Sequence, residues 1–105
     1  MRKKKIKINY NYAFVFYDVR DIESKVGKNR VQKVFKICKK YFSHHQKSVF
    51  RGEITPSKLI ALNAELLKVI DKKEDFITVI KTLNKNSFGE ETLGTNHNNT
   101  EGLFI

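Results

Sequence analysis

The clearest pattern in the chain is an almost unbroken apolar run from Tyr12 to Tyr17, which closes with Asp18 and Val19. Strands buried on both faces have continuous apolar runs rather than alternating ones, so residues 12–19 are predicted to form a buried strand. Asp18 then places a carboxylate at the carboxyl end of that strand. Because ligands of open sheets gather beyond the carboxyl ends of the strands, Asp18 is the first candidate for chemistry.

A helix is predicted over residues 28–42, after a polar connection from Arg20 to Gly27. Its apolar positions recur at the spacing of one helical face. These positions are Val31, Val34, Phe35, Cys38, Tyr41 and Phe42. On the other face Lys33, Lys36 and Lys40 follow one another at spacings of three and four residues, so their ammonium groups should form one solvent-facing stripe.

The next segment is predicted to be a strand, a turn and a second strand. Residues 46–51 are expected to form the longer strand, Gly52 a turn or bulge, and Glu53-Ile54 a short partner strand. His44 and His45 precede them as a polar strand entry. Adjacent residues of a strand point to opposite faces, so these two imidazoles are not expected to chelate one ion.

A second helix is expected to begin at Pro56. Thr55 can cap the free amide groups there, and Pro at the first helical position lacks only a hydrogen that would have no partner. The buried stripe of this helix comprises Leu59, Leu62, Leu66, Val69 and Ile70. The polar run at residues 71–75 should end the helix, and residues 76–83, rich in β-branched side chains, are predicted to be the last strand.

The predicted order is strand, helix, strand, strand, helix, strand. It is typical of a ferredoxin-like α+β fold, with an antiparallel sheet and both helices on one of its faces. Residues 1–84 form this single domain, with residues 1–11 as a basic lead-in or, alternatively, an extension of the first strand. The other sheet face would stay open in a monomer, so a homodimer is expected. The polar tail, residues 85–105, ends in Leu103-Phe104-Ile105 and is expected to dock on the partner subunit.

The charge balance favours a polyanionic partner. The chain of 105 residues has a formal charge of +10, and residues 85–105 contain one basic and three acidic residues, so the excess lies earlier. From Lys25 to Lys47 there are eight Lys or Arg residues and no Asp or Glu. Nucleic acid is favoured over an anionic membrane surface. No stretch is long and apolar enough to span a bilayer or to serve as a signal-peptide core, and one cysteine cannot form an internal disulfide, so a cytoplasmic location is expected.

The candidate site residues each have a structural alternative. Asp18 could bind Mg²⁺ or Mn²⁺, or could merely accept backbone hydrogen bonds at the end of its strand. Asp21 is expected to cap the turn before the helix, and Cys38 is expected to be a core residue. The basic side chains could contact phosphates or form a solvated face, and phosphate contact is favoured. The nucleic-acid-binding candidates are Arg20, Lys28, Arg30, Lys33, Lys36 and Lys40.

Several motifs resemble the smaller of the two core CRISPR spacer-acquisition proteins, the Cas two family. Tyr17-Asp18-Val19 is similar to the strand-end aspartate motif of that family, and Gly27-Lys28-Asn29-Arg30 with Lys33-Val34 is similar to the start of its basic first helix. Residues 46–50 with Gly52 resemble its second-strand signature. Pro56, Ile70-Asp71 and the strand after Asp75 follow in the expected order, so the resemblance spans about residues 12–83.

The resemblance implies a ferredoxin-like homodimer in which a C-terminal strand is exchanged between subunits. It also implies metal-dependent nuclease activity on RNA or DNA, and a central position bridging two dimers of the Cas one integrase. Two copies of Asp18 would meet across the dimer axis to hold the metal, with Tyr17, Ser48 and Phe50 beside them; ordinary sheet packing is the alternative for Ser48 and Phe50. Arg51 departs from the acidic residue of many relatives, and the basic prefix is longer than usual.

The leading interpretation is a dimeric component of CRISPR spacer acquisition that binds double-stranded DNA through backbone phosphates. Phosphodiesterase activity at Asp18 is expected to depend on Mg²⁺ or Mn²⁺, with single-stranded RNA as a second candidate substrate. Two other classes stay open: a stand-alone endoribonuclease of toxin type and a non-enzymatic nucleic-acid-binding module.

Overall fold

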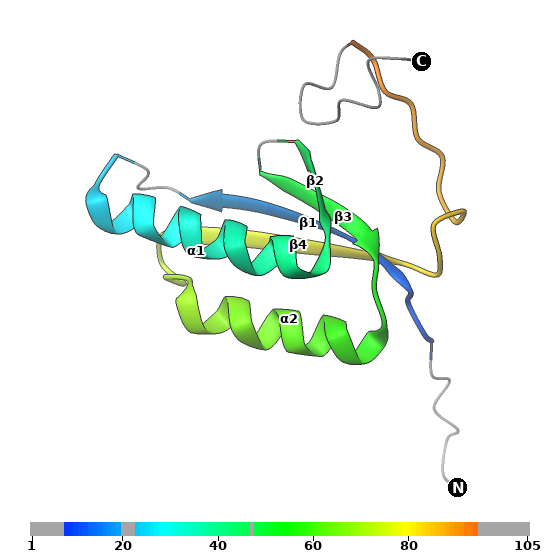
Figure 1. Cartoon of the computed structure of the whole chain (residues 1–105), viewed down its shortest axis with the longest axis horizontal. Coiled ribbons are helices and arrows are strands. Elements are labelled where there is room, and N and C mark those ends of the chain that lie inside the picture. The colour runs from blue at the N-terminus through cyan, green and yellow to red at the C-terminus, as the bar shows by residue number, and fades with distance from the viewer. Residues whose placement is uncertain (1–7, 20–22, 47, 95–105) are drawn as a thin grey trace, which may run out of the picture.

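The computed structural model describes residues 8–19, 23–46 and 48–94, and it confirms the α+β, ferredoxin-like fold (Figure 1). Both helices cover the same face of a four-stranded antiparallel sheet, whose strand order is β2-β3-β1-β4. Within the described residues, neither helix is long and apolar enough to cross a membrane. The elements are β1 (Tyr12–Val19), α1 (Lys25–Tyr41), β2 (Ser43–Gln46), β3 (Val49–Glu53), α2 (Pro56–Val69) and β4 (Asp75–Thr82).

The central strand β1 separates two different environments. It pairs antiparallel with β3 on one side and with β4 on the other. Successive side chains of a strand point to opposite faces. Ala13, Val15 and Tyr17 are buried beneath the helices, whereas Phe16 and Asp18 are exposed on the opposite face. We call this second face, which no helix covers, the open face.

Both helices begin at a capping side chain. The hydroxyl of Ser24 accepts a hydrogen bond from the amide of Gly27 at 3.0 Å, so α1 begins at Lys25, three residues before the predicted start. Asp21, the residue expected to cap this turn, lies outside the described residues. The second helix begins at Pro56 as predicted, with the Thr55 hydroxyl accepting from the amide of Lys58 at 3.3 Å.

The predicted position of the hairpin is wrong. The chain reverses after Gln46 rather than at Gly52, so β2 is the polar segment Ser43–Gln46 and β3 continues through Gly52 to Glu53. Gly52 pairs with Ala13, and a Cβ atom added there would lie 3.3 Å from Cδ1 of Phe42. The glycine therefore leaves room for the Phe42 ring beside the sheet; it does not make a turn.

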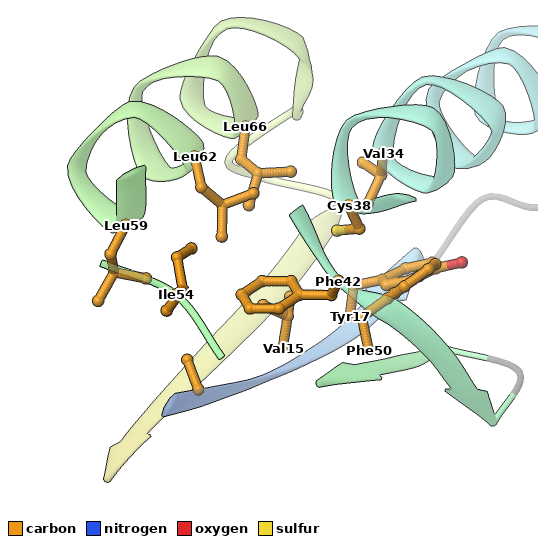
Figure 2. Packing of buried hydrophobic residues seen from close by; sticks show 11 residues of the cluster. Val15, Tyr17, Val34, Cys38, Phe42, Phe50, Ile54, Leu59, Leu62 and Leu66 are labelled. Atoms are coloured by element: carbon orange, nitrogen blue, oxygen red, sulfur yellow. The ribbon is translucent and has the colours of Figure 1, made fainter. Parts of the chain in front are cut away.

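The core lies between the helices and the inner face of the sheet (Figure 2). Phe50 and Val15 come from the sheet, and Val34, Cys38 and Leu62 come from the two helices; all five are fully buried. The apolar stripes predicted for both helices face this layer. Burial raises the pKa of the Cys38 thiol to about 12, so Cys38 is a core residue, as predicted, and is kept protonated at neutral pH.

The open face keeps an apolar surface that this chain covers in part. Phe16, Phe76 and Ile80 are 38%, 71% and 48% exposed. Farther along the face, Phe88 from the segment after β4 packs against the rings of Tyr12 and Phe14, with centroids 5.3 and 4.9 Å away. Glu90 of the same segment forms an ion pair with Arg51 of β3. Leu103-Phe104-Ile105 lies outside the described residues.

Candidate functional site

Asp18 lies at the carboxyl end of β1, on the open face, with an exposed side chain. Its backbone partner on β4 is Phe76. A pocket of about 300 Å³ opens beside it, lined by Asp18, Lys72, Lys73, Glu74, Asp75 and Phe76. The carboxylate therefore lies at the end of a strand, as predicted from the sequence, and it lines a pocket.

Asp75, which lines the pocket, belongs to a buried ion pair. Nε of Arg30 donates to Oδ2 of Asp75 at 3.0 Å, and the two side chains are 12% and 0% exposed. The same oxygen accepts the amide of Asp71 at 2.8 Å. Arg30 was expected to contact nucleic acid, but here it fastens α1 to the start of β4. Its charge is compensated by an acid 45 residues away in the sequence.

Lys40, another candidate for phosphate contact, also has an acidic partner. Its ammonium group and the hydroxyl of Tyr41 both hydrogen-bond the carboxylate of Glu65 on α2. The hydrogen bond with Glu65 raises the pKa of Lys40, and the bonds from Lys40 and Tyr41 lower the pKa of Glu65. The segment from Lys25 to Lys47 has no acid of its own, but α2 and β4 supply acids to it in space.

Lys28, Lys33 and Lys36 are solvent-exposed basic side chains, as the sequence predicted. All three are exposed on α1, and within the described part of the chain none forms an ion pair with an acidic side chain. They lie on the helical side of the sheet, whereas Asp18 lies on the open face. Arg20 lies outside the described residues.

Tyr17, Ser48 and Phe50 support the strand that carries Asp18. The carbonyl of Ser48 accepts the amide of Tyr17 at 3.0 Å. The rings of Tyr17 and Phe50 stack with centroids 6.2 Å apart in the core, where burial raises the pKa of Tyr17 (Figure 2). Since both rings lie on the face opposite Asp18, ordinary sheet packing describes Phe50, and its support of the site is indirect.

The histidines belong to the packing of β2. The ring of His44 lies against Phe35 and Phe50, with centroids 4.9 and 4.8 Å away. Burial, then the charges of Arg51 and His44, lowers the pKa of His45. Among the described residues no three His, Cys, Asp or Glu side chains gather closely enough to hold a metal ion.

The chemistry of Asp18 suits a hard cation held by few protein ligands. Mg²⁺ is commonly bound by one or two carboxylates together with waters and substrate phosphates. In one chain Asp18, with Glu74 lining the same pocket, supplies carboxylate oxygens of that kind. A larger groove, about 490 Å³ between α2 and β4, shares Lys72, Asp75 and Phe76 with this pocket but is mostly apolar and includes neither Asp18 nor Glu74.

Lys72 and Lys73 were not among the candidates, because the sequence suggested only that residues 71–75 end a helix. The signal that could have found them is topological. In an antiparallel pair the residues preceding one strand lie beside the end of the other. Since β4 pairs with β1 from Val19↔Asp75 onward, the turn before Asp75 had to lie next to Asp18.

Comparison with known proteins agrees with this fold. The family model described as CRISPR associated protein Cas2 matches residues 11–90. A Thermodesulfovibrio yellowstonii protein named CRISPR-associated endoribonuclease Cas2 3 is 42% identical over 79% of this chain and 86% of its own. The Thermotoga maritima protein named CRISPR-associated endoribonuclease Cas2 is 36% identical over 79% of this chain and 87% of its own.

A solved structure of a family member has the same fold. Cas2 of Streptococcus pyogenes superimposes with a TM-score of 0.69 and 36% sequence identity, over 79% of this chain and 99% of that one. The family model covers β1 to β4 together with Phe88 and Glu90, and therefore includes Asp18 and its pocket. The chain belongs to the CRISPR associated protein Cas2 family.

Proposed function

We propose that two copies of this chain pair through their open faces to form a nucleic-acid-binding homodimer that acts in CRISPR spacer acquisition and hydrolyses phosphodiester bonds at Asp18. The observation that carries the proposal is the position of Asp18, an exposed carboxylate beside a pocket on an apolar sheet face. Relatives named endoribonucleases support hydrolysis, with RNA as a substrate. Family membership favours this interpretation over a stand-alone toxin.

The apolar open face supports the dimer. Monomeric proteins rarely leave contiguous apolar patches exposed unless these bind something, and Phe16, Phe76 and Ile80 remain accessible here. A second copy presenting the same patch would cover both by twofold symmetry. Phe76 pairs with Asp18 in the sheet, so this contact would also bring the two copies of Asp18 toward one another.

In the mechanism each residue has a limited role. Two Asp18 carboxylates would hold Mg²⁺ or Mn²⁺, which when bound polarises a phosphodiester oxygen and lowers the pKa of an attacking water. Tyr17 and Ser48 keep the end of β1 in place through their backbone hydrogen bond. In the dimer, the two paired open faces would exclude water from one side of the pocket.

The basic helix gives the dimer its binding surface. Lys28, Lys33 and Lys36 are exposed and would contact backbone phosphates without reading bases, so binding should be independent of sequence and weaken steeply with salt. In the same proposal the dimer bridges two dimers of the Cas one integrase on double-stranded DNA. Phe88 and Glu90 pack on the sheet of their own chain, and the residues beyond Glu90 would extend the contact onto the partner subunit.

The proposal is tested by Ile80→Lys, which puts a charge into the patch at a position paired with Phe14. We expect the variant to sediment as a folded monomer and to lose Mg²⁺-dependent hydrolysis of RNA. Because Ile80 is already 48% exposed, the added charge should not disrupt the core. Ile60→Lys is the matched control, since Ile60 is 71% exposed on α2, away from the open face. A dimeric Ile80→Lys protein, or a monomer that still hydrolyses RNA, would contradict the proposal.

A further inference from the structure

The turn between α2 and β4 is held unusually firmly for an exposed connection. The carbonyl of Asp71 accepts the amides of Glu74 and Asp75 at 3.0 and 2.8 Å. The carboxylate of Asp71 accepts the amide of Lys73 at 2.9 Å. The Asp75 carboxylate closes the turn from the other side by accepting the amide of Asp71 at 2.8 Å. Four hydrogen bonds therefore fix the backbone of residues 71–75.

This turn is also fastened to the rest of the protein. Oδ2 of Asp75, the atom that closes the turn, receives Nε of Arg30 from α1. Asp75 pairs with Val19 at the end of β1, directly after Asp18. The turn and the candidate catalytic carboxylate are thus parts of one packed unit, and the two exposed lysines of the turn line the same pocket as Asp18.

The charges of the turn are distributed in favour of an anionic ligand. Arg30 compensates Asp75, and the Asp71 carboxylate is engaged with a backbone amide. Among the described residues, Lys72 and Lys73 form no ion pair. Asp18 and Glu74 bring two carboxylates to this pocket, which alone would repel a phosphodiester, and the ammonium groups of Lys72 and Lys73 offset that charge. The ordinary alternative is a pair of solvated lysines at a helix end.

We propose that Lys72 and Lys73 are the phosphate-binding residues of the Asp18 pocket, where they contact the backbone phosphates next to the scissile bond of a single-stranded RNA. The inference rests on the proposed function, because it names the substrate contacts of the same site. The Arg30–Asp75 ion pair holds these lysines in position. Nucleic acid would then contact this turn, on the Asp18 side of the sheet, in addition to the lysines of α1.

The test is the double variant Lys72→Gln, Lys73→Gln, compared with Lys58→Gln, Lys68→Gln, which removes the same charge from exposed positions on α2. Cleavage of an unstructured, single-stranded RNA oligonucleotide is followed with Mg²⁺. We expect KM to rise roughly tenfold and kcat to change by less than about threefold, because each lost lysine removes a substrate contact rather than the reacting group. The control should match the unmodified protein.

Binding of the same RNA is then measured against salt in proteins that also carry Asp18→Asn. Each phosphate contact on a single strand contributes about 0.7 to the slope of log affinity against log salt, so the double variant should lose about 1.4. Equal slopes in the double variant and its control would overturn the inference, whether or not cleavage is observed. Full RNA cleavage by Asp18→Asn alone would instead overturn the proposed function, so the two failures are distinguishable.

Discussion

Asp75 has a fully buried side chain whose carboxylate accepts hydrogen bonds from Arg30 and from the amide of Asp71. Breaking a buried ion pair by removing one partner leaves an uncompensated charge, which typically costs several kcal/mol. We expect Asp75→Asn to lower the free energy of unfolding by roughly 3–5 kcal/mol. Glu53→Gln, which neutralises an exposed carboxylate at the end of β3, should change it by less than about 0.5 kcal/mol.

Urea unfolding followed by circular dichroism measures both variants. An Asp75→Asn protein as stable as the unmodified one would mean that the pair contributes nothing to holding α1 against β4. A Glu53→Gln protein destabilised to the same extent would mean that general charge balance, rather than this contact, is responsible.

At the scale of single residues, local pattern predicted the position of Asp18 at a strand end but not the ion pair of Arg30. Asp18 follows directly from an apolar run, so its place at a strand end needs no information from elsewhere in the chain. The partner of Arg30 lies 45 residues away and that of Lys40 lies 25 away, so counting acids within one segment could not reveal either ion pair. Lys72 and Lys73 were not candidates because their place in the Asp18 pocket depends on which strand lies beside them.

Among the elements, β3 depends on a glycine that no turn requires. A Cβ atom at Gly52 would lie 3.3 Å from the ring of Phe42, which is only 7% exposed and cannot easily move. We expect Gly52→Ala to destabilise the protein by about 1 kcal/mol, because crowding in the core outweighs the entropy gained by replacing glycine. Gly89→Ala should be neutral or slightly stabilising, since nothing lies within 4 Å of its added Cβ.

Thermal unfolding of the two alanine variants separates these effects. If Gly52→Ala is as stable as Gly89→Ala, Phe42 has moved aside without cost and the glycine is not needed for packing.

The elements differ in how well the sequence predicts them. The helices were predicted from apolar periodicity and from caps such as Thr55-Pro56, and β1 was predicted from its unbroken apolar run. The order of the predicted elements indicated the ferredoxin-like fold. The edge strand β2 consists of Ser43–Gln46, which has neither alternation nor β-branched residues. Its strand character comes from pairing with β3 and from the packing of His44 on Phe50, which are tertiary effects.

For the whole molecule, the sheet separates two kinds of surface. The exposed lysines of α1 lie on the helical side, and Asp18 with the apolar patch of Phe16, Phe76 and Ile80 lies on the open face. In a dimer joined through the open faces, both lysine stripes would point outward while the two Asp18 residues lie at the interface. Binding long nucleic acid and hydrolysing a phosphodiester would then depend on different parts of the molecule.

This separation makes Asp18→Asn the most direct test of the account. The substitution keeps the size of the side chain and removes the charge that a divalent ion needs, and the exposed residue contributes little to the core. We expect Mg²⁺-dependent cleavage of RNA to fall about 100-fold or more, as the loss of several kcal/mol of transition-state stabilisation implies. Dimerisation, melting temperature and spacer integration by the Cas one integrase should be unchanged. A folded, dimeric Asp18→Asn protein that still cleaves RNA at the original rate would contradict the account.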